Sequence, residues 1–67
     1  MQNFKTKNQA MAFGLLATRK DLERIESDRD LLASLFQLKK NAGEIEYLFA
    51  MASRIETLDA ALLAATL

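Results

Sequence analysis

The segment LKKNAGEIEYL, near the middle of this 67-residue chain, constrains the fold more than any other. Its two lysines, Lys39 and Lys40, suit the last turn of a helix, because positive charge is favoured at the negative end of the helix dipole. Gly43 suits the left-handed backbone conformation that ends many helices. Glu44 and Glu46 suit the first turn of a following helix, where negative charge is favoured. The charge reversal therefore predicts a helix end beside a helix start.

A link this short, closed at Asn41–Gly43, joins neighbouring antiparallel helices. The second helix of this coiled-coil-like hairpin is predicted from about Glu44 to Thr66. Its apolar stripe consists of Ile45, Leu48, Met51, Ala52, Ile55, Leu58, Leu62 and Ala65. That spacing is typical of a helix that buries one broad face.

Two apolar stripes with different directions precede the turn. The first consists of Met11, Leu15, Leu22 and Ile25. The second consists of Leu31, Leu32, Leu35, Phe36 and Leu38. Their centres differ by roughly 120° around a single helix axis. The segment ESDRD between them has no apolar residue, and Ser27 followed by Asp30 is a helix-start signal. We therefore predict a break near Ser27 after a helix from about Lys7 to Glu26; the alternative is one helix from Lys7 to Asn41.

Composition supports an all-α fold. The chain has no proline and no valine, and its 12 leucines and 11 alanines outnumber seven β-branched residues. That mixture favours helices over strands. No linker or repeat divides the sequence, so we predict one small domain over residues 1–67. Its architecture is an antiparallel helical hairpin with a preceding N-terminal helix, two or three helices in total.

The chain lacks the features that usually stabilise small domains. It has no cysteine for disulfides or thiolate zinc sites and no histidine, yet 51% of its residues are hydrophobic. Such a chain is expected to oligomerise; the alternative is a tightly packed small monomer.

Catalysis is not expected. The serines and threonines have no histidine or cysteine beside them, and no glycine-rich phosphate loop occurs. Glu23 and Glu26 share a helix face, but arginines at positions 19, 24 and 29 can pair with them as ordinary surface ion pairs. We therefore predict no catalytic, cofactor-binding or metal-binding residues.

Nucleic-acid binding is the alternative function from a different class. A helical-hairpin dimer acting as a transcriptional, plasmid or phage regulator would use a basic patch of Lys5, Lys7, Arg19 and Lys20. The formal net charge of zero argues against this function. So does the acidic start of the last helix, which would enter the major groove in a helix-turn-helix.

Two apolar segments exceed what one hairpin can cover. They are AMAFGLLA, residues 10–17, and AALLAATL, residues 60–67. We predict that they lie near one end of the molecule, with Phe13, Leu16, Leu62 and Leu63 on one contiguous surface, and that Gly14 lets a partner helix approach closely. The predicted partner-binding residues are Met11, Phe13, Leu16, Leu58, Leu62 and Leu63. Their partner would be a helix of another protein or a second copy.

The chain resembles the small helical E-type co-chaperones of the type III secretion needle subunit. The similarity lies in its length, in KKNAG before the turn, and in the last-helix run ASRIETLDAALLAATL, within Leu22–Leu67. The segment AMAFGLLA departs from that family by being more apolar. The resemblance implies an all-helical, non-catalytic subunit that joins a tetratricopeptide-like chaperone to keep the needle protein soluble.

A cytoplasmic location is expected. Lys5 and Lys7 before AMAFGLLA superficially resemble a signal peptide, but the residues that follow are charged and strongly helical. No apolar run approaches the ~18 residues needed for a membrane span.

Overall fold

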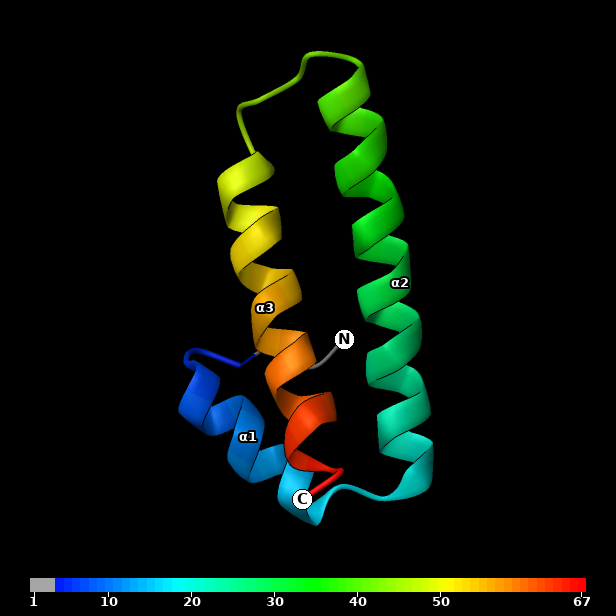
Figure 1. Cartoon of the computed structure of the whole chain (residues 1–67), viewed down its shortest axis with the longest axis vertical. Helices are drawn as coiled ribbons and strands as arrows, with labels where there is room; N and C mark the ends of the chain where they lie inside the picture. Colours follow the sequence, from blue (N-terminus) through cyan, green and yellow to red (C-terminus); the bar gives the residue numbers. More distant parts are fainter. Residues whose placement is uncertain (1–3) are drawn as a thin grey trace.

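The protein, described by a computed structural model over residues 4–67, consists of three α-helices (Figure 1). They are α1 (Lys7–Leu16), α2 (Arg19–Asn41) and α3 (Leu48–Ala64). No strand occurs within residues 4–67, so the predicted all-α class is confirmed. The first three residues of the predicted 1–67 domain lie outside the described part of the chain.

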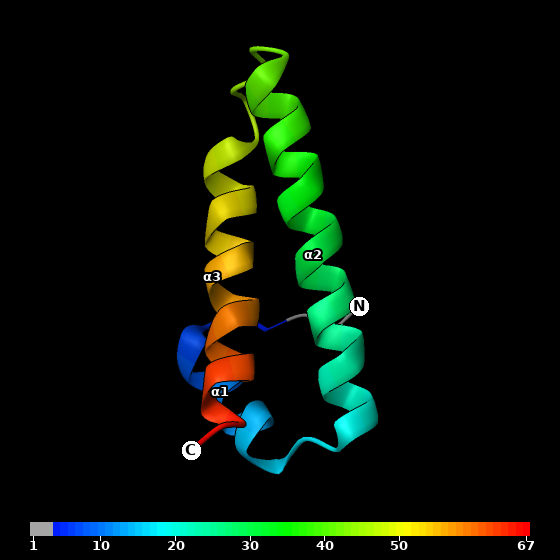
Figure 2. The same cartoon turned by 45° about the vertical axis from the view of Figure 1, so that its right-hand side comes forward.

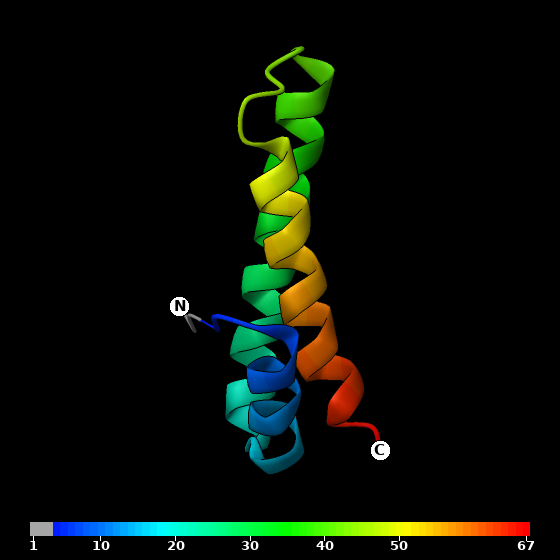
Figure 3. The same ribbon diagram turned by 90° about the vertical axis from the view of Figure 1, so that its left-hand side faces the viewer.

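Helix α3 packs against both other helices. α2 and α3 run antiparallel, as the predicted hairpin requires, and α1 lies beside the C-terminal half of α3 (Figure 1). Figures 2 and 3 show the same placement of α1 from two other directions. With 10 and 23 residues, α1 and α2 are about 15 and 34 Å long at 1.5 Å per residue. The half of the hairpin near the α2–α3 connection is therefore built from two helices only.

The break between the first two helices lies at Ala17 and Thr18, not near Ser27. Ala17 (φ −69°, ψ 143°) and Thr18 (φ −75°, ψ 164°) both have extended backbone. Ser27 lies inside α2 with an exposed side chain. The predicted first helix to Glu26 and the alternative single helix from Lys7 to Asn41 are therefore both wrong.

A capping box at Thr18 accounts for the position of the break. The Thr18 hydroxyl accepts a hydrogen bond from the Asp21 backbone N–H at 3.2 Å, and the Asp21 carboxylate accepts one from the Thr18 N–H at 3.2 Å. Asp21 also places negative charge in the first turn of α2. Ser27 and Asp30 have the same spacing, but inside a helix the backbone N–H groups already donate to the preceding turn. At Thr18, in contrast to Ser27, the backbone N–H groups of the following turn are free to donate to the capping side chain.

Thr18→Ala should lower the free energy of unfolding by about 1 kcal/mol, because it removes the N-cap hydrogen bond of the longest helix. Ser27→Ala, a matched change inside α2, should alter it by less than about 0.5 kcal/mol. Urea unfolding followed by circular dichroism measures both. A larger loss for Ser27→Ala than for Thr18→Ala would contradict this assignment.

The end of α2 has the predicted turn. Gly43 has a φ of +76°. Its N–H donates to the Lys40 carbonyl at 3.1 Å, and the Glu44 N–H donates to the Lys39 carbonyl at 2.9 Å. This pair of bonds is the Schellman motif, which satisfies carbonyls left free at the helix end. Both lysines lie in the last turn of α2, as predicted.

Helix α3 starts later than predicted. Glu44 and Glu46 lie in the connection before α3 and not in its first turn. The Glu44 N–H closes α2, and its carboxylate accepts a hydrogen bond from Lys39 Nζ at 3.2 Å. Glu44 therefore belongs to the end of α2, and the helix begins only at Leu48. Ile45, predicted to share the apolar stripe of this helix, is 77% exposed.

The core lies where α1 and α2 both meet α3. Its fully buried residues are Ala10, Ile25, Leu58 and Ala61, and Phe4, Phe13, Leu32, Ala60 and Leu62 pack against them. Ile25 and Leu58 are the two largest fully buried side chains among the described residues. A core this small matches the limited burial expected of a short chain.

Gly14 is the point of closest approach between α1 and α3. A Cβ added there would overlap the carbonyl oxygen of Ala61 and lie 2.9 Å from its carbonyl carbon. Ala10 and Ala64, also buried, are small as well. The close approach predicted for Gly14 thus occurs within the chain, to α3.

Gly14→Ala should lower the free energy of unfolding by up to about 2 kcal/mol. Alanine improves helix propensity by about 1 kcal/mol, but overpacking typically costs 1–3 kcal/mol, and here the obstruction is backbone that cannot rotate away. Asn8→Ala, at an exposed site of the same helix, is the control and should leave stability unchanged or slightly higher. Urea unfolding decides, and a stabilised Gly14→Ala variant would disprove the close crossing.

Candidate interaction surface

Large apolar side chains are exposed at both ends of the molecule. Eleven of those described in residues 4–67 are exposed, whereas only Ile25 and Leu58 are large and fully buried. One group, which we call the α1–α3 end, consists of Met11, Leu15, Leu16, Leu63 and Leu67. The other, which we call the hairpin end, consists of Leu31, Leu35, Leu38, Ile45, Tyr47 and Phe49. No other feature of the described structure is as prominent.

Three of the six predicted partner-binding residues are exposed. Leu16 is 88%, Leu63 66% and Met11 39% exposed. Leu16 ends α1 just before the link to α2, which leaves its side chain without helix neighbours on the C-terminal side. These three side chains are available to a partner.

The other three predicted residues contribute to the core. Leu58 is fully buried between the helices, so this conformation gives a partner no access to it. Phe13 and Leu62 are partly buried against the core, and the Phe13 ring lies 5.3 Å from that of Phe4 at 55°. Tilted rings at this distance are a favourable aromatic pair. The reason for the difference is that α1 folds back onto α3 and covers this side of it.

An open depression of about 590 Å³ lies between the start of α1 and the C-terminal half of α3. It is lined by Lys7, Glu56, Asp59, Ala60, Leu62 and Leu63. Leu62 and Leu63, which are neighbours in the sequence, both line it, but Phe13 and Leu16 do not. The contiguous surface predicted for all four is therefore only partly formed at this depression.

Ion pairs border the depression. Lys7 Nζ lies 3.2 Å from Glu56 Oε2, which links α1 to α3. Arg29 Nε donates to Asp59 Oδ1 at 2.9 Å, which links α2 to α3. The hydrogen bond to Asp59, followed by the one to Asp30, raises the pKa of Arg29 above its ordinary value. An apolar centre with a charged border is the common anatomy of a protein–protein interface. Sequence reasoning missed these charges, because their partners are far apart along the chain.

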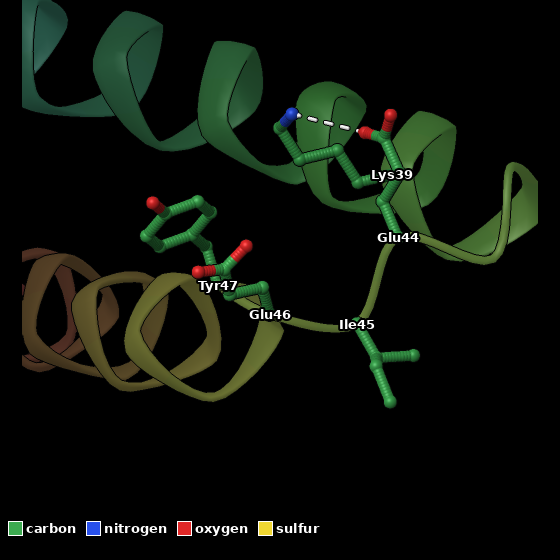
Figure 4. A pocket seen from close by; sticks show the side chains of 5 residues that line it. All are labelled: Lys39, Glu44, Ile45, Glu46 and Tyr47. Atoms are coloured by element: carbon green, nitrogen blue, oxygen red, sulfur yellow. Dashed lines mark hydrogen bonds and ion pairs between the residues drawn. The ribbon is translucent and has the colours of Figure 1, made fainter.

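A second depression, of about 470 Å³, lies at the α2–α3 connection (Figure 4). Its lining consists of Lys39, Glu44, Ile45, Glu46 and Tyr47. Figure 4 shows the Lys39–Glu44 ion pair on one side and the Ile45 side chain pointing away from it. The lining combines a lysine, two carboxylates and a phenol, and the lysine is paired with one of the carboxylates, that of Glu44.

The basic patch of the alternative function is partly neutralised. Lys7 pairs with Glu56, and Arg19 Nε lies 3.7 Å from Glu23 Oε1. Lysine and arginine side chains that bind phosphates must be free to replace counterions. Both pairs are exposed and contribute little energy, so they reduce the charge of the patch of Lys5, Lys7, Arg19 and Lys20 only slightly.

Leu58→Ala and Leu63→Ala test which side of α3 is buried and which is exposed. Leu58→Ala removes a fully buried side chain and should lower the free energy of unfolding by about 2–5 kcal/mol. Leu63→Ala is the same substitution at an exposed site of the same helix and should change it by less than about 1 kcal/mol. Thermal or urea unfolding is the measurement, and similar losses at both sites would contradict the placement of α3.

Residues 4–67 contain no group of three or more His, Cys, Asp or Glu side chains arranged to hold a metal ion. In the same part of the chain, none of the helices combines the length and the apolar character needed to cross a membrane. Comparisons with protein-family models, with curated proteins and with solved structures find no match for the chain.

Proposed function

We propose that this chain is a non-catalytic protein–protein interaction module, an adaptor or co-chaperone subunit that buries an apolar helix surface against a helix of a partner protein. The observation that carries the proposal is the excess of exposed over buried large apolar side chains. Exposed apolar clusters on a small soluble domain are typical of interaction sites. Burial against a partner would also supply stability that so small a core lacks.

The α1–α3 end is the proposed docking surface. Leu16 and Leu63 expose most of their side chains there. Leu63 also lines the depression with Leu62 and Ala60, and the Lys7–Glu56 and Arg29–Asp59 ion pairs border it. A partner helix with its own apolar stripe would cover the leucines, and the ion pairs would remain at the solvated edge. This arrangement places hydrophobic burial at the centre, where it contributes most to affinity.

Within this proposal, we favour a cytoplasmic co-chaperone similar to the E-type subunits of type III secretion. The charged helix α2, the Gly43 turn and the apolar helix α3 occur in the order typical of that family. The partners would then be a tetratricopeptide-like chaperone and the needle subunit. A ternary complex of these three proteins in size-exclusion chromatography would support this assignment, and separate elution at micromolar concentration would contradict it.

Leu16→Asp/Leu63→Asp should abolish or strongly weaken capture of the partner while leaving the fold intact. Each large side chain buried at an interface contributes roughly 1.5–3 kcal/mol, so the dissociation constant should rise by at least about 100-fold. Glu46→Ala, at an exposed polar site of the connection, is the control and should bind as the wild type does. The measurements are affinity capture from the native cell with mass spectrometry, then calorimetry with the isolated partner.

Equal capture by the wild type and the double aspartate variant would disprove the docking surface. Salt-dependent binding of DNA or RNA at micromolar protein concentration, lost in a Lys5→Ala/Lys20→Ala variant, would instead establish the nucleic-acid-binding alternative. Circular dichroism of every variant excludes unfolding as the cause of lost binding.

A further inference from the structure

Three exposed leucines form a narrow stripe along the second half of α2. Leu31, Leu35 and Leu38 are 59%, 41% and 65% exposed. Spacings of four and three residues place them within about 60° of one another around the helix. Leu32 and Phe36, by contrast, are turned by roughly 100° from this stripe and are partly buried. We call Leu31, Leu35 and Leu38 the α2 leucine stripe.

The stripe is confined to the part of α2 that α1 does not reach. One and two turns before Leu31, the same face carries Ser27 and Arg24. Figures 1 and 2 show α1 beside the other half of the hairpin. α1 packs against α3 and not against this face of α2, where Arg24 and Ser27 are exposed. The three leucines are therefore the apolar part of an uncovered helix face, which a helix of another molecule can occupy.

The distribution of charge along α2 favours a second copy of the chain, in antiparallel orientation, as the partner at the α2 leucine stripe. Residues 23–30 carry four acidic and two basic side chains, whereas residues 37–40 carry two lysines and no acid. In an antiparallel pair, the acidic segment of each copy lies beside the lysines of the other, at both ends of the stripe. In a parallel pair, like charges would meet at both ends. Because the formal net charge of the chain is zero, no overall repulsion opposes association.

The leucine spacing also defines the register. When Leu31 faces Leu38 of the second copy, Leu35 lies next to the two-fold axis and meets its own equivalent. Asp28 and Lys39 lie on the same side of the stripe, about 20° apart around the helix, and in an antiparallel pair the equal sides of the two helices meet. Asp28 of each copy then comes within about 3 Å, along the helix axis, of Lys39 of the other. Within one chain Lys39 pairs with Glu44 at 3.2 Å in an exposed ion pair, which contributes little energy and can exchange at low cost.

We propose that two copies of this chain associate through the α2 leucine stripe, antiparallel about a two-fold axis near Leu35, to form a four-helix bundle from the two hairpins. The exposed leucines in the two-helix half of each molecule are then covered by those of the second copy. This surface is separate from Leu16 and Leu63, so the dimer does not rest on the proposed function.

Sedimentation of the full chain over a range of concentrations tests the dimer. Leu31→Gln/Leu35→Gln/Leu38→Gln should raise the dimer dissociation constant by on the order of 100-fold or more, with helix content retained, because glutamine is a good helix former. Leu63→Asp is the control and should leave the dimer intact. A wild-type monomer at the highest concentrations, or a dimer that survives the triple substitution, would overturn the proposal.

Spin labels test the orientation, and the absence of native cysteine makes single labelling sites simple to introduce. In the proposed register, labels on Ser34→Cys lie almost level across the two-fold axis. Labels on Ser27→Cys are offset by about 23 Å along the helix axis, at 1.5 Å per residue. A clearly longer distance at position 27 than at position 34 supports the antiparallel dimer, and equal distances at both positions would overturn it. Added salt should weaken the antiparallel dimer, since it screens opposite charges.

Discussion

The contact between Gly14 of α1 and the backbone of Ala61 in α3 is the interaction on which the rest of the structure depends. It brings α1 close enough for Ala10 and Ala61 to be fully buried and for Phe13 to cover the core. Without α1, the hairpin of α2 and α3 would have a solvated face along its whole length. Helices with small residues at their crossing gain many weak dispersion contacts, because their backbones are close. The absence of a Cβ at one residue therefore determines where this molecule has three helices.

The shortness of α1 has an equally large consequence. It supplies a third helix to one half of the hairpin and leaves the other half with two. Leu58 and Ile25 are buried in the first half, while Leu31, Leu35 and Leu38 are exposed in the second. The exposed leucines are spaced as in helices that pack together, and they are not scattered singly. Association with another helix, which we propose both at the α2 leucine stripe and at the α1–α3 end, would bury such a surface.

Part of the candidate site was predictable and part was not. The apolar segments at residues 10–17 and 60–67 showed that Leu16 and Leu63 exceed what a hairpin can cover, and both are exposed. The same reasoning selected Leu58, which is buried, because a helical period gives the side of a helix but not the neighbour that covers it. The Lys7–Glu56 pair joins residues 49 positions apart, and no local pattern predicts such a contact. The two directions of the stripes before the turn predict a break near Ser27, whereas in the structure the second direction includes the exposed face of α2.

Local chemistry in the sequence determined the helical class and the end of α2. Gly43 and the two lysines before it act within a single turn, so their effect does not depend on the rest of the fold. The tertiary structure decided between two equivalent start signals, Thr18 and Ser27, because α2 is continuous through Ser27 and leaves it no free N–H to cap. It also decided which leucines form the core, since that depends on where α1 crosses α3 and how far it extends. Burial is a property of neighbours distant in sequence, and only the folded chain brings them together.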